Sequence, residues 1–296
     1  HFAYPAQGEW KRRIVHDCLK RIGGIEADVG WLEEPTLRMG YRTRAEFQCA
    51  EGLVGFFSPN SHDIVEIESC PLCHPRLNEV LEGLKTAKPS QPVEVVVNPE
   101  GMDIQVWTHK PDRRLHGAFP EPKEFLFDGV PVVPGAFTQS SLLLNRLLVR
   151  EVIRLVGVTK KILDLYCGSG NLALSLTNAD YVLGIDHNRR AIDAARATGR
   201  GEFRSGDEIV FCEALHKNWD AVILDPPRTG AKAIVPALAK CDTAAIIYVS
   251  CDPATLARDL KILVAAGWHV EEAVAVDLFP HTAHVETVCR LSRTTR

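Results

Sequence analysis

Cys251 lies where a thiol can act as a nucleophile. Residues 246–250 form an apolar run that predicts a strand, and Asp252 with Pro253 then begins a predicted helix. Aspartate at the N-cap and proline at the first helical position are typical of a helix start. A thiol beside a helix N-terminus has a lowered pKa, and its thiolate is the reactive form. This position favours a catalytic role for Cys251 over that of an inert core cysteine.

The segment 277–286 carries groups that can move protons. It contains His284 and ends at Glu286. A positioned carboxylate is a common general base, and an imidazole is a second group that can take up or give a proton near neutral pH. These two residues are a further reason to expect chemistry at Cys251.

A glycine turn follows another predicted strand. Residues 162–165 end in this turn, where Gly168 and Gly170 stand, with Ala173 three positions further on. Glycine lets the backbone approach a ligand closely, and a helix that starts there presents its N-terminal amides. The same spacing matches the G-x-G-x-x-A pattern of dinucleotide sites, so a dehydrogenase is one interpretation.

Two carboxylates near this turn bear on the choice of cofactor. Asp186 ends the next predicted strand, where it could bind the ribose hydroxyls of either NAD or S-adenosylmethionine. Asp164 lies inside the first strand, four residues before Gly168. A pyrophosphate disfavours a nearby negative charge, whereas S-adenosylmethionine has no phosphate and carries an ammonium that a carboxylate can pair. Asp164 therefore favours the methyl donor.

The sequence Asp225-Pro226-Pro227-Arg228 follows a third apolar strand. The two prolines restrict the loop that would lie over cofactor and substrate. Enzymes that methylate exocyclic amines of bases commonly have an aromatic residue after this Pro-Pro pair, and that residue stacks on the base. Because Arg228 stands there instead, the pattern departs from the amino-methylating type.

These groups require elements that bring them together. Beyond about residue 140 the predicted strands and helices alternate, which indicates an α/β fold with a mostly parallel, doubly wound sheet. Ligands bind such a sheet at the carboxyl ends of its strands. The expected strands are 161–166, 181–185, 221–224, 244–249, 272–277 and 284–291, and the expected helices are 140–155, 253–266 and three that begin near residues 170, 189 and 231.

The first part of the chain has a different pattern. Residues 9–22 and 77–84 predict helices, and Gly23-Gly24 ends the first of them. Short extended segments separated by turn residues are expected at 41–50, 53–57, 64–68, 93–98 and 104–108, and one further short strand is expected at 124–127. We therefore expect a β-rich α+β domain over residues 1–122 and a catalytic domain over residues 123–296, with the first helix packed on the catalytic domain.

The composition is that of an ordinary globular protein. The chain is 46% hydrophobic, enough to bury a core, and it contains no apolar run long enough to predict a membrane span. The nine cysteines are scattered and no signal peptide precedes them, which favours reduced thiols in the cytoplasm. The net charge of -4 counts mildly against a nucleic-acid partner. Local basic groups occur at 11–13, at Arg42 with Arg44, and at 113–114.

Four motifs, in this order, resemble those of the RNA 5-methyluridine methyltransferases. They are Phe137-Thr138-Gln139, the Asp225 to Arg228 sequence, the nucleophile motif that begins at Ser250-Cys251, and the general-base motif from Phe279-Pro280 to Glu286. The resemblance covers nearly the whole chain. It implies a class I S-adenosylmethionine-dependent methyltransferase fold, S-adenosylmethionine as the cofactor and RNA as the partner.

The resemblance also implies a covalent mechanism. Uracil C5 is a weak nucleophile, and in this family a cysteine thiolate adds to C6, which makes C5 reactive enough to take a methyl group. A base then removes the C5 proton so that the thiolate can leave. Cys251 and Glu286 would fill these two roles. The target uridine has to leave its stack to reach such a pocket.

Further contacts follow from the same resemblance. Gln139, Tyr166, Gly168, Asn171, Asp186 and Asp225 are expected at the methyl donor or the target base, and Arg42, Arg44, Arg228 and His284 are expected at the RNA. Arg42 and Arg44 flank Thr43 on a predicted strand, so their side chains point to one face and suit phosphate or base contacts. Ala214 stands where the family has a further asparagine, so that contact is missing from the expected set.

The N-terminal residues resemble the iron–sulfur members of this family. Residues 1–7 resemble the stretch just after the cluster-binding cysteines, and residues 61–71 resemble the segment with the fourth cysteine. Cys70 is therefore expected as one ligand of a [4Fe-4S] cluster in a longer protein, although four thiolates are needed and this chain does not complete the site. With Cys73 and His74 a zinc site is an alternative, but an inert Cys73 is the simpler interpretation. The absence of the family's small N-terminal β-barrel indicates a truncated or short variant.

The combined prediction is methylation of uridine C5 in ribosomal RNA. The same chemistry on the T-loop of transfer RNA is the alternative. A non-catalytic RNA-binding relative is a competing class, which the joint presence of Cys251 and Glu286 disfavours, and the same two motifs disfavour a dehydrogenase. We expect a cytoplasmic monomer that has RNA as its partner.

Overall fold

The computed structural model of the chain describes residues 2–293, so His1 lies outside the described residues. Two compact units are present. The first joins the segment up to Glu34 to the segment from Arg146 onward, and the second is Pro35–Asn145. The second unit extends to Asn145, beyond the expected boundary at residue 122. The N-terminal segment, whose first helix is expected to pack on the catalytic domain, belongs with the C-terminal part. Helix α3 (Leu142–Val156) crosses the second boundary.

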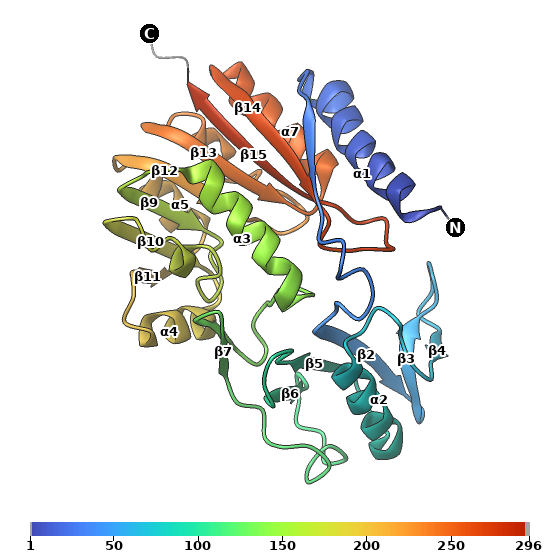
Figure 1. Cartoon of the computed structure of the whole chain (residues 1–296). Coiled ribbons are helices and arrows are strands. Elements are labelled where there is room, and N and C mark those ends of the chain that lie inside the picture. The colour runs from blue at the N-terminus through green and yellow to red at the C-terminus, as the bar shows by residue number, and fades with distance from the viewer. Residues whose placement is uncertain (1, 294–296) are drawn as a thin grey trace. The chain divides into compact units, whose positions relative to one another are not determined.

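The first unit is built on an eight-stranded sheet with the order β1-β14-β15-β13-β12-β9-β10-β11 (Figure 1). Neighbouring strands pair in parallel except at β15, which is antiparallel to both β13 and β14. The strands are β1 (Val29–Leu32), β9 (Lys161–Leu165), β10 (Tyr181–Asp186), β11 (Glu202–Ser205), β12 (Trp219–Leu224), β13 (Thr243–Ser250), β14 (Trp268–Val276) and β15 (Glu286–Arg293). The expected doubly wound α/β sheet is confirmed, and β1 extends it at one edge.

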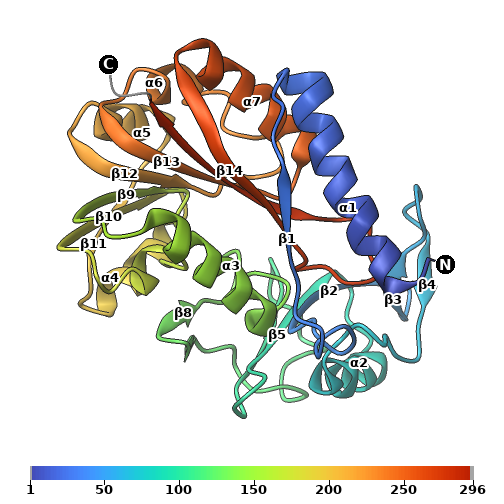
Figure 2. The ribbon, with the colours of Figure 1, turned by 45° about the horizontal axis from the view of Figure 1, so that its top comes forward.

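Helices cover both faces of this sheet, with α3 on one face and α5 and α7 on the other (Figures 1 and 2). The helices that belong wholly to this unit are α1 (Tyr4–Cys18), α4 (Arg189–Ala197), α5 (Glu208–Leu215), α6 (Val235–Leu238) and α7 (Pro253–Ala265). α1 has a proline in its first turn, continues as a π-helical turn at Leu19–Gly23, and is followed by Gly24 with φ of 69°. Among residues 2–293 no helix is both long and apolar enough to cross a membrane.

The carboxyl ends of the parallel strands form one edge of the sheet. β9 lies between β10 and β12, so the strand order reverses there, and such a switch point is where doubly wound sheets bind ligands. Because β15 runs in the opposite direction, its first residue, Glu286, arrives at this same edge. The register pairs Thr287 with Ser250, the last residue of β13. The residues that follow β9, β10, β12 and β13 therefore lie at the same end of the sheet as Glu286, the first residue of β15. We call this end of the sheet the strand edge.

The second unit has its own antiparallel sheet, in the order β4-β3-β2-β5-β6. Helix α2 (Pro75–Ala87) packs against it through a core that includes Leu77, Leu81 and Leu84. The strands are β2 (Arg44–Ala50), β3 (Leu53–Phe57), β4 (Ile64–Glu66), β5 (Val93–Val97) and β6 (Ile104–Trp107), and a separate hairpin consists of β7 (Phe125–Phe127) and β8 (Val130–Val132). The β-rich α+β character expected for the first part of the chain is found in this unit.

Some elements differ from those that periodicity predicts. β1, β8, β11 and α5 are additional, and β1 and β11 have only four residues each, too few to show alternation. The prediction of a helix after Gly170 is wrong, since only a 3-10 turn forms at Ala173–Ser175. The chain must start β10 at Tyr181, and Thr177 with Asn178 favours a turn over a helix.

Candidate active site

Cys251 and Glu286 lie at neighbouring strands of the first unit. Cys251 directly follows β13 and is half-buried, whereas Glu286 begins β15 with only 3% of its surface exposed. The residues beside them, Ser250 and Thr287, pair across the two strands. The antiparallel return of β15 thus places a carboxyl near the thiol, although α7 and β14 separate the two residues along the chain.

The electrostatic environment of Cys251 differs from the expected one. Asp252 caps α7, as predicted. Burial nevertheless raises the pKa of Cys251 to about 11, and the charges of Glu286 and Asp225 act in the same direction, while Arg228 opposes them. The pKa is therefore raised and not lowered as expected, because desolvation and two neighbouring carboxyls both favour the protonated thiol.

Asp225, which is half-buried, and Glu286, which is buried, form a carboxyl pair. Burial raises the pKa of Asp225 to about 7. Burial, and secondarily the charge of Asp225, raise the pKa of Glu286 well above its ordinary range. Oε1 of Glu286 is buried and has no hydrogen-bond partner among the described residues. A carboxyl with a raised pKa is a stronger base once it is ionised, so this pair is suited to exchanging a proton with a bound ring.

Arg228 brings a positive charge to the same cluster. It lies in the loop after β12, and its Nη2 is 3.4 Å from Nδ1 of His284. A hydrogen bond from its side chain acts to lower the pKa of Cys251, against the larger effect of burial. His284 is exposed and meets the ring of Phe279 edge-on, with 5.8 Å between ring centroids. Arg228 and His284 are therefore brought together beside the thiol.

The turn after β9 forms the second part of the site. Tyr166, Gly168 and Gly170 have positive φ angles of 61°, 57° and 93°. A Cβ at Gly168 would meet no atom within 4 Å, whereas one at Gly170 would lie 2.7 Å from Cγ of Leu174. Packing therefore requires glycine at position 170, while Gly168 leaves open space in front of the turn. Asn171 follows in the same turn and is half-buried.

Asp186 closes this turn from the end of β10. Its carboxylate accepts hydrogen bonds from the backbone N–H of Gly168 at 2.9 Å and from that of Asn188 at 2.7 Å. A carboxylate offers about four acceptor sites, so ribose hydroxyls can still bind. Tyr166 packs edge-on against Phe211, with 4.8 Å between ring centroids, which fixes the start of the turn.

Asp164 lies beneath the turn with none of its surface exposed. Its Oδ2 accepts a hydrogen bond from the backbone N–H of Ala173 at 2.9 Å, and its Oδ1 is buried without a partner among the described residues. Burial, followed by repulsion from Asp225, raises the pKa of Asp164 well above its ordinary range. An orphaned buried acceptor beside an open glycine turn fits S-adenosylmethionine, which carries both an ammonium and a ribose. Asp164 and Asp186 are the residues that would hold these two groups.

Gln139, Arg42 and Arg44 belong to the second unit. Gln139 is half-buried in the loop before α3. Thr43 is fully buried, so the two arginines on either side of it turn to the opposite face together, as expected. Arg44 forms an ion pair with Glu94 on β5. The charge of Arg44 is therefore partly neutralised within the unit.

Cys70 lies in a tight turn of the second unit. Its carbonyl accepts the backbone N–H of Cys73 at 3.0 Å, and its own N–H donates to the side chain of Asn78 at 2.9 Å. A hydrogen bond from the Cys73 thiol lowers the pKa of Cys70 to about 6, although burial opposes the shift. Within residues 2–293, no three His, Cys, Asp or Glu side chains are grouped so that they could hold a metal ion. This part of the chain alone therefore does not fit a [4Fe-4S] cluster or a zinc site.

A buried ion pair, which the sequence did not predict, anchors the loop that leads to Glu286. Lys11 on α1 is 3% exposed and pairs with Asp277 just after β14, with 2.7 Å between Nζ and Oδ1. Tyr4 donates to the other carboxylate oxygen at 2.5 Å, and Lys11 also donates to the carbonyl of Phe279 at 2.9 Å. The N-terminal helix thus helps to position the base of the proposed site.

A second network, also not predicted, is centred on Asp259 of α7, which has none of its surface exposed. Its Oδ2 accepts from the Tyr248 hydroxyl at 2.7 Å and from the backbone N–H of Ala231 at 2.8 Å. Its Oδ1 pairs with Arg258 at 2.8 Å. In the sequence, this network is indicated only by the presence of a charged residue on the otherwise apolar, buried face of α7.

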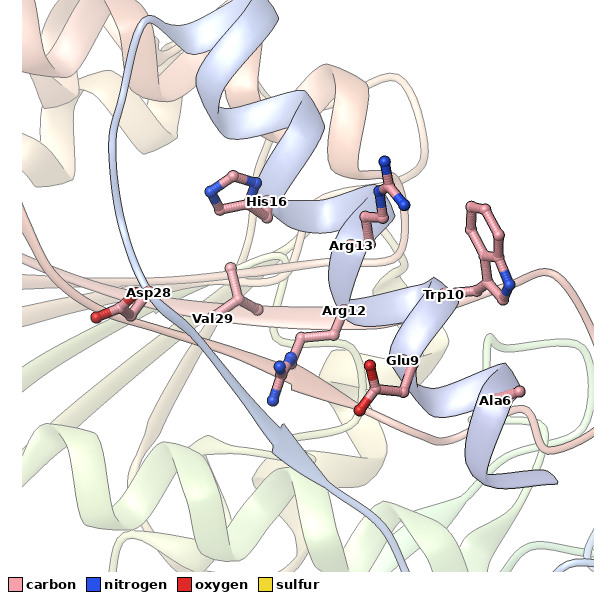
Figure 3. Close-up of a pocket in the computed structure, with 8 residues that line it drawn as sticks. All are labelled: Ala6, Glu9, Trp10, Arg12, Arg13, His16, Asp28 and Val29. Carbon is pink, nitrogen blue, oxygen red and sulfur yellow. The ribbon is translucent and has the colours of Figure 1, made fainter.

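An open hollow of about 760 Å³ lies elsewhere on the first unit, between α1 and the start of β1 (Figure 3). It is lined by Arg12 and Arg13, by the ring of Trp10, and by the acidic side chains of Glu9 and Asp28. The guanidinium of Arg13 lies 5.3 Å from the centroid of that ring. None of the groups at the strand edge lines this hollow, so it is not the site of the expected chemistry.

Comparisons with known proteins agree with the geometry at the strand edge. A family model described as tRNA (Uracil-5-)-methyltransferase matches residues 200–294, a range that includes Asp225, Cys251 and Glu286. A second family model, described as Methyltransferase small domain, matches residues 134–241 and includes the glycine turn. The two matches together cover the catalytic sheet of the first unit from β9 to β15.

Similar proteins extend this result to nearly the whole chain. An uncharacterized RNA methyltransferase of Agrobacterium fabrum is 32% identical over 99% of this chain and 80% of its own length. A 23S rRNA (uracil(1939)-C(5))-methyltransferase of Aromatoleum aromaticum is 29% identical over 99% of this chain and 82% of its own length. The crystal structure of the Pyrococcus abyssi tRNA (uracil-54, C5)-methyltransferase with S-adenosyl-L-homocysteine matches with a TM-score of 0.78 and 28% identity, covering 98% of this chain and 84% of that one. With its class I methyltransferase sheet and these relatives, the chain belongs to the family of RNA 5-methyluridine methyltransferases, S-adenosylmethionine-dependent enzymes that methylate uracil C5 in RNA.

Proposed function

We propose that this protein methylates C5 of a uridine in ribosomal RNA through a covalent bond between Cys251 and C6 of the uracil. The observation that carries the proposal is the placement of the Cys251 thiol beside the carboxyls of Glu286 and Asp225 at the strand edge. A nucleophile next to a carboxyl with a raised pKa provides both functions that substitution at C5 requires.

The proposed reaction begins when the Cys251 thiol gives up its proton to water and its sulfur adds to C6. The C5–C6 double bond becomes a single bond, and the electron pair makes C5 nucleophilic as part of an enolate. When bound, S-adenosylmethionine supplies the methyl group that C5 takes. In its carboxylate form Glu286 then accepts the C5 proton, the double bond forms again, and Cys251 leaves as a thiolate that takes up a proton from water. The positive charge of Arg228 beside the sulfur would stabilise the thiolate at both ends of the cycle.

The glycine turn would hold the methyl donor. Gly168 offers open space, Asp186 would bind the ribose hydroxyls, and Asp164 would pair the ammonium. The further contacts proposed are those of Tyr166, Asn171, Asp225 and Gln139 with the donor or the target base, and those of Arg42, Arg44, Arg228 and His284 with the RNA.

Ribosomal RNA is proposed as the substrate because relatives from several bacteria bear the name of a 23S rRNA methyltransferase. The transfer-RNA alternative is supported by the similarity to the Pyrococcus abyssi tRNA enzyme. Mapping 5-methyluridine in both RNAs of a strain that lacks the gene distinguishes them. We expect the loss of a modification in 23S rRNA, and loss in transfer RNA alone would reverse the assignment.

Two variants test the covalent mechanism. Glu286→Gln removes the base but leaves the nucleophile, so an RNA adduct that carries the new methyl group should accumulate and survive a denaturing gel. Cys251→Ala should form neither adduct nor product. Both variants should still bind S-adenosylmethionine in calorimetry, because neither residue lies in the glycine turn.

The matched comparison is Cys251→Ala against Cys212→Ala on one RNA substrate. Cys212 is a half-buried cysteine of α5 that has no proposed role in the reaction, and its replacement should leave activity close to that of the unsubstituted protein. If Cys251→Ala still makes 5-methyluridine at a comparable rate, the nucleophile is wrongly assigned.

For Cys70 we propose a contribution to a [4Fe-4S] cluster only together with thiolates from outside residues 2–293. The support is the resemblance of residues 61–71 to the segment with the fourth cysteine. A longer chain with the further cysteines should show the broad visible absorbance of such a cluster, and Cys70→Ala should remove it. A colourless and fully active longer protein would leave Cys70 with a structural role.

A further inference from the structure

The loop that carries Arg228 is attached to the helix that starts beside Cys251. Thr255, in the first turn of α7, donates its hydroxyl to the carbonyl of Arg228 at 3.0 Å. Arg258, one turn further along, donates to the carbonyl of Thr229 at 2.8 Å. Two successive carbonyls of the loop are therefore held by side chains of one helix, and that helix begins two residues after the thiol.

Asp259 holds the end of the same loop. It accepts the backbone N–H of Ala231 at 2.8 Å, and the Tyr248 hydroxyl from β13 donates to the same carboxylate oxygen at 2.7 Å. Arg258 pairs with the other oxygen. Because the carboxylate is fully buried, these hydrogen bonds are shielded from water and fix the loop firmly.

The loop itself is shaped to fit this contact. Gly230 has a φ of 75°, and a Cβ there would lie 2.5 Å from Oδ2 of Asp259 and 2.5 Å from Nη2 of Arg258. The N–H of Gly230 donates to the carbonyl of Pro227 at 2.8 Å, which closes a tight turn with Arg228 at its tip. A turn this tight, clamped by a buried carboxylate, leaves the Arg228 side chain few directions in which to point.

We propose that Asp259 is a positioning residue that, through the Pro227–Ala231 turn, holds the guanidinium of Arg228 against the Cys251 thiol. The inference rests on the proposed function, since it takes Cys251 as the nucleophile. Arg228 is the partner of the thiol in this geometry, and Asp259 acts only through Arg228. Removing the carboxylate charge should let the turn move and withdraw the positive charge from the sulfur.

The alkylation rate of Cys251 as a function of pH reports the effect directly and needs no RNA. Glu286 and Asp225 act to hold the proton on this thiol, Arg228 acts to release it, and His284 lies beside Arg228. Iodoacetamide labelling of the full chain, followed by mass spectrometry of the Cys251 peptide, separates this thiol from the other cysteines. In Asp259→Asn, labelling should be about three- to tenfold slower at a pH below the thiol pKa, as expected for a pKa shift of about half a unit to one unit.

Arg228→Ala provides the reference for this effect. It should slow labelling at least as much, and adding Asp259→Asn to it should change nothing further if Asp259 acts through Arg228. Asp259→Asn should also lower kcat on RNA, with less effect on KM, while the affinity for S-adenosylmethionine stays the same. A normal labelling profile in a folded Asp259→Asn protein would overturn the proposal and leave Asp259 a purely structural residue.

A second pair of variants covers the case in which Asp259→Asn does not fold. Thr255→Val removes the hydroxyl that holds the carbonyl of Arg228, and Thr255→Ser keeps it. Cys251 labelling that is slower in Thr255→Val and normal in Thr255→Ser supports the attachment of the loop to α7. Cys251 labelling at the same rate in the two variants overturns it. Failure of the proposed function would be seen in a different experiment. Methylation would then persist in Cys251→Ala, while the labelling rates of the Asp259 and Thr255 variants would still be as predicted.

Discussion

Gly168 and Gly170 stand in the same turn, yet replacing each with alanine should have different consequences. At Gly170 the added Cβ would lie 2.7 Å from Leu174 at a φ of 93°, so Gly170→Ala should destabilise the fold by roughly 1–3 kcal/mol. At Gly168 the Cβ would meet no protein atom, so Gly168→Ala should cost less stability but weaken S-adenosylmethionine binding about tenfold or more, since it fills the proposed cofactor space.

Denaturant unfolding and calorimetry on the two variants separate these effects. Each variant is the control for the other, because both substitutions add one methyl group and the two positions are only two residues apart. If Gly168→Ala binds S-adenosylmethionine as tightly as the unsubstituted protein, the open space before the turn does not hold the cofactor.

The raised pKa of Cys251 leads to a prediction about its reactivity. Burial and the carboxyls of Glu286 and Asp225 raise this pKa to about 11, so the protein without ligands should hold only about one thiolate in ten thousand at neutral pH. Alkylation of Cys251 should therefore rise about tenfold per pH unit and level off only near pH 11. Peptide mass spectrometry across this range is the measurement. A plateau near neutral pH would show that the helix N-terminus lowers the pKa of Cys251 in spite of burial and the two carboxyls.

At the scale of elements, α1 anchors the loop before Glu286 through the buried pair of Lys11 and Asp277. Lys11→Met leaves the Asp277 carboxylate buried without its cation, which should lower the free energy of unfolding by roughly 3–5 kcal/mol. Activity should fall as well, because the loop leads to the proposed base.

Lys20→Met is the matched control, since Lys20 pairs with Glu26 on the solvent-exposed surface. It should leave the free energy of unfolding nearly unchanged, because exposed pairs contribute little. Urea denaturation of both variants is the test. Equal stability of Lys11→Met and Lys20→Met would mean that the buried pair does not hold α1 in place.

At the scale of the whole molecule, the net charge of -4 limits how the protein can hold RNA. Only three arginines are among the proposed RNA contacts, so the affinity for the proposed RNA should depend only weakly on salt, with a slope of about -0.7 for each contact to a single strand. Arg42→Ala should reduce the slope by about one contact. Arg44→Ala should have a smaller effect, since Glu94 already neutralises part of its charge.

Binding measured over a range of salt concentrations gives these slopes. A steep dependence, typical of many phosphate contacts, would contradict this picture and point to a larger basic surface. An equal loss of slope in the two variants would show that the ion pair of Arg44 with Glu94 opens when RNA binds.

Sequence patterns by themselves predict the class of the catalytic sheet and the strand ends at which its polar groups lie. Alternating apolar strands and helices predicted the doubly wound sheet, and strand ends predicted where Gly168, Asp186, Asp225 and Cys251 would meet. Such signals are local, because the period of a strand or helix and the residues after it lie within one stretch of chain. The short strands β1 and β11 carry too few residues for this signal and were therefore not found.

Tertiary structure alone decided the protonation of the site and the contacts that hold it. The pKa of Cys251 is raised rather than lowered, because burial and the carboxyls of Glu286 and Asp225 depend on groups that are distant in sequence. The same is true of the pair of Lys11 with Asp277 and of the network around Asp259, whose partners come from different elements. A hydrogen bond or a desolvated charge is a property of distances in space, which spacing along a chain does not encode.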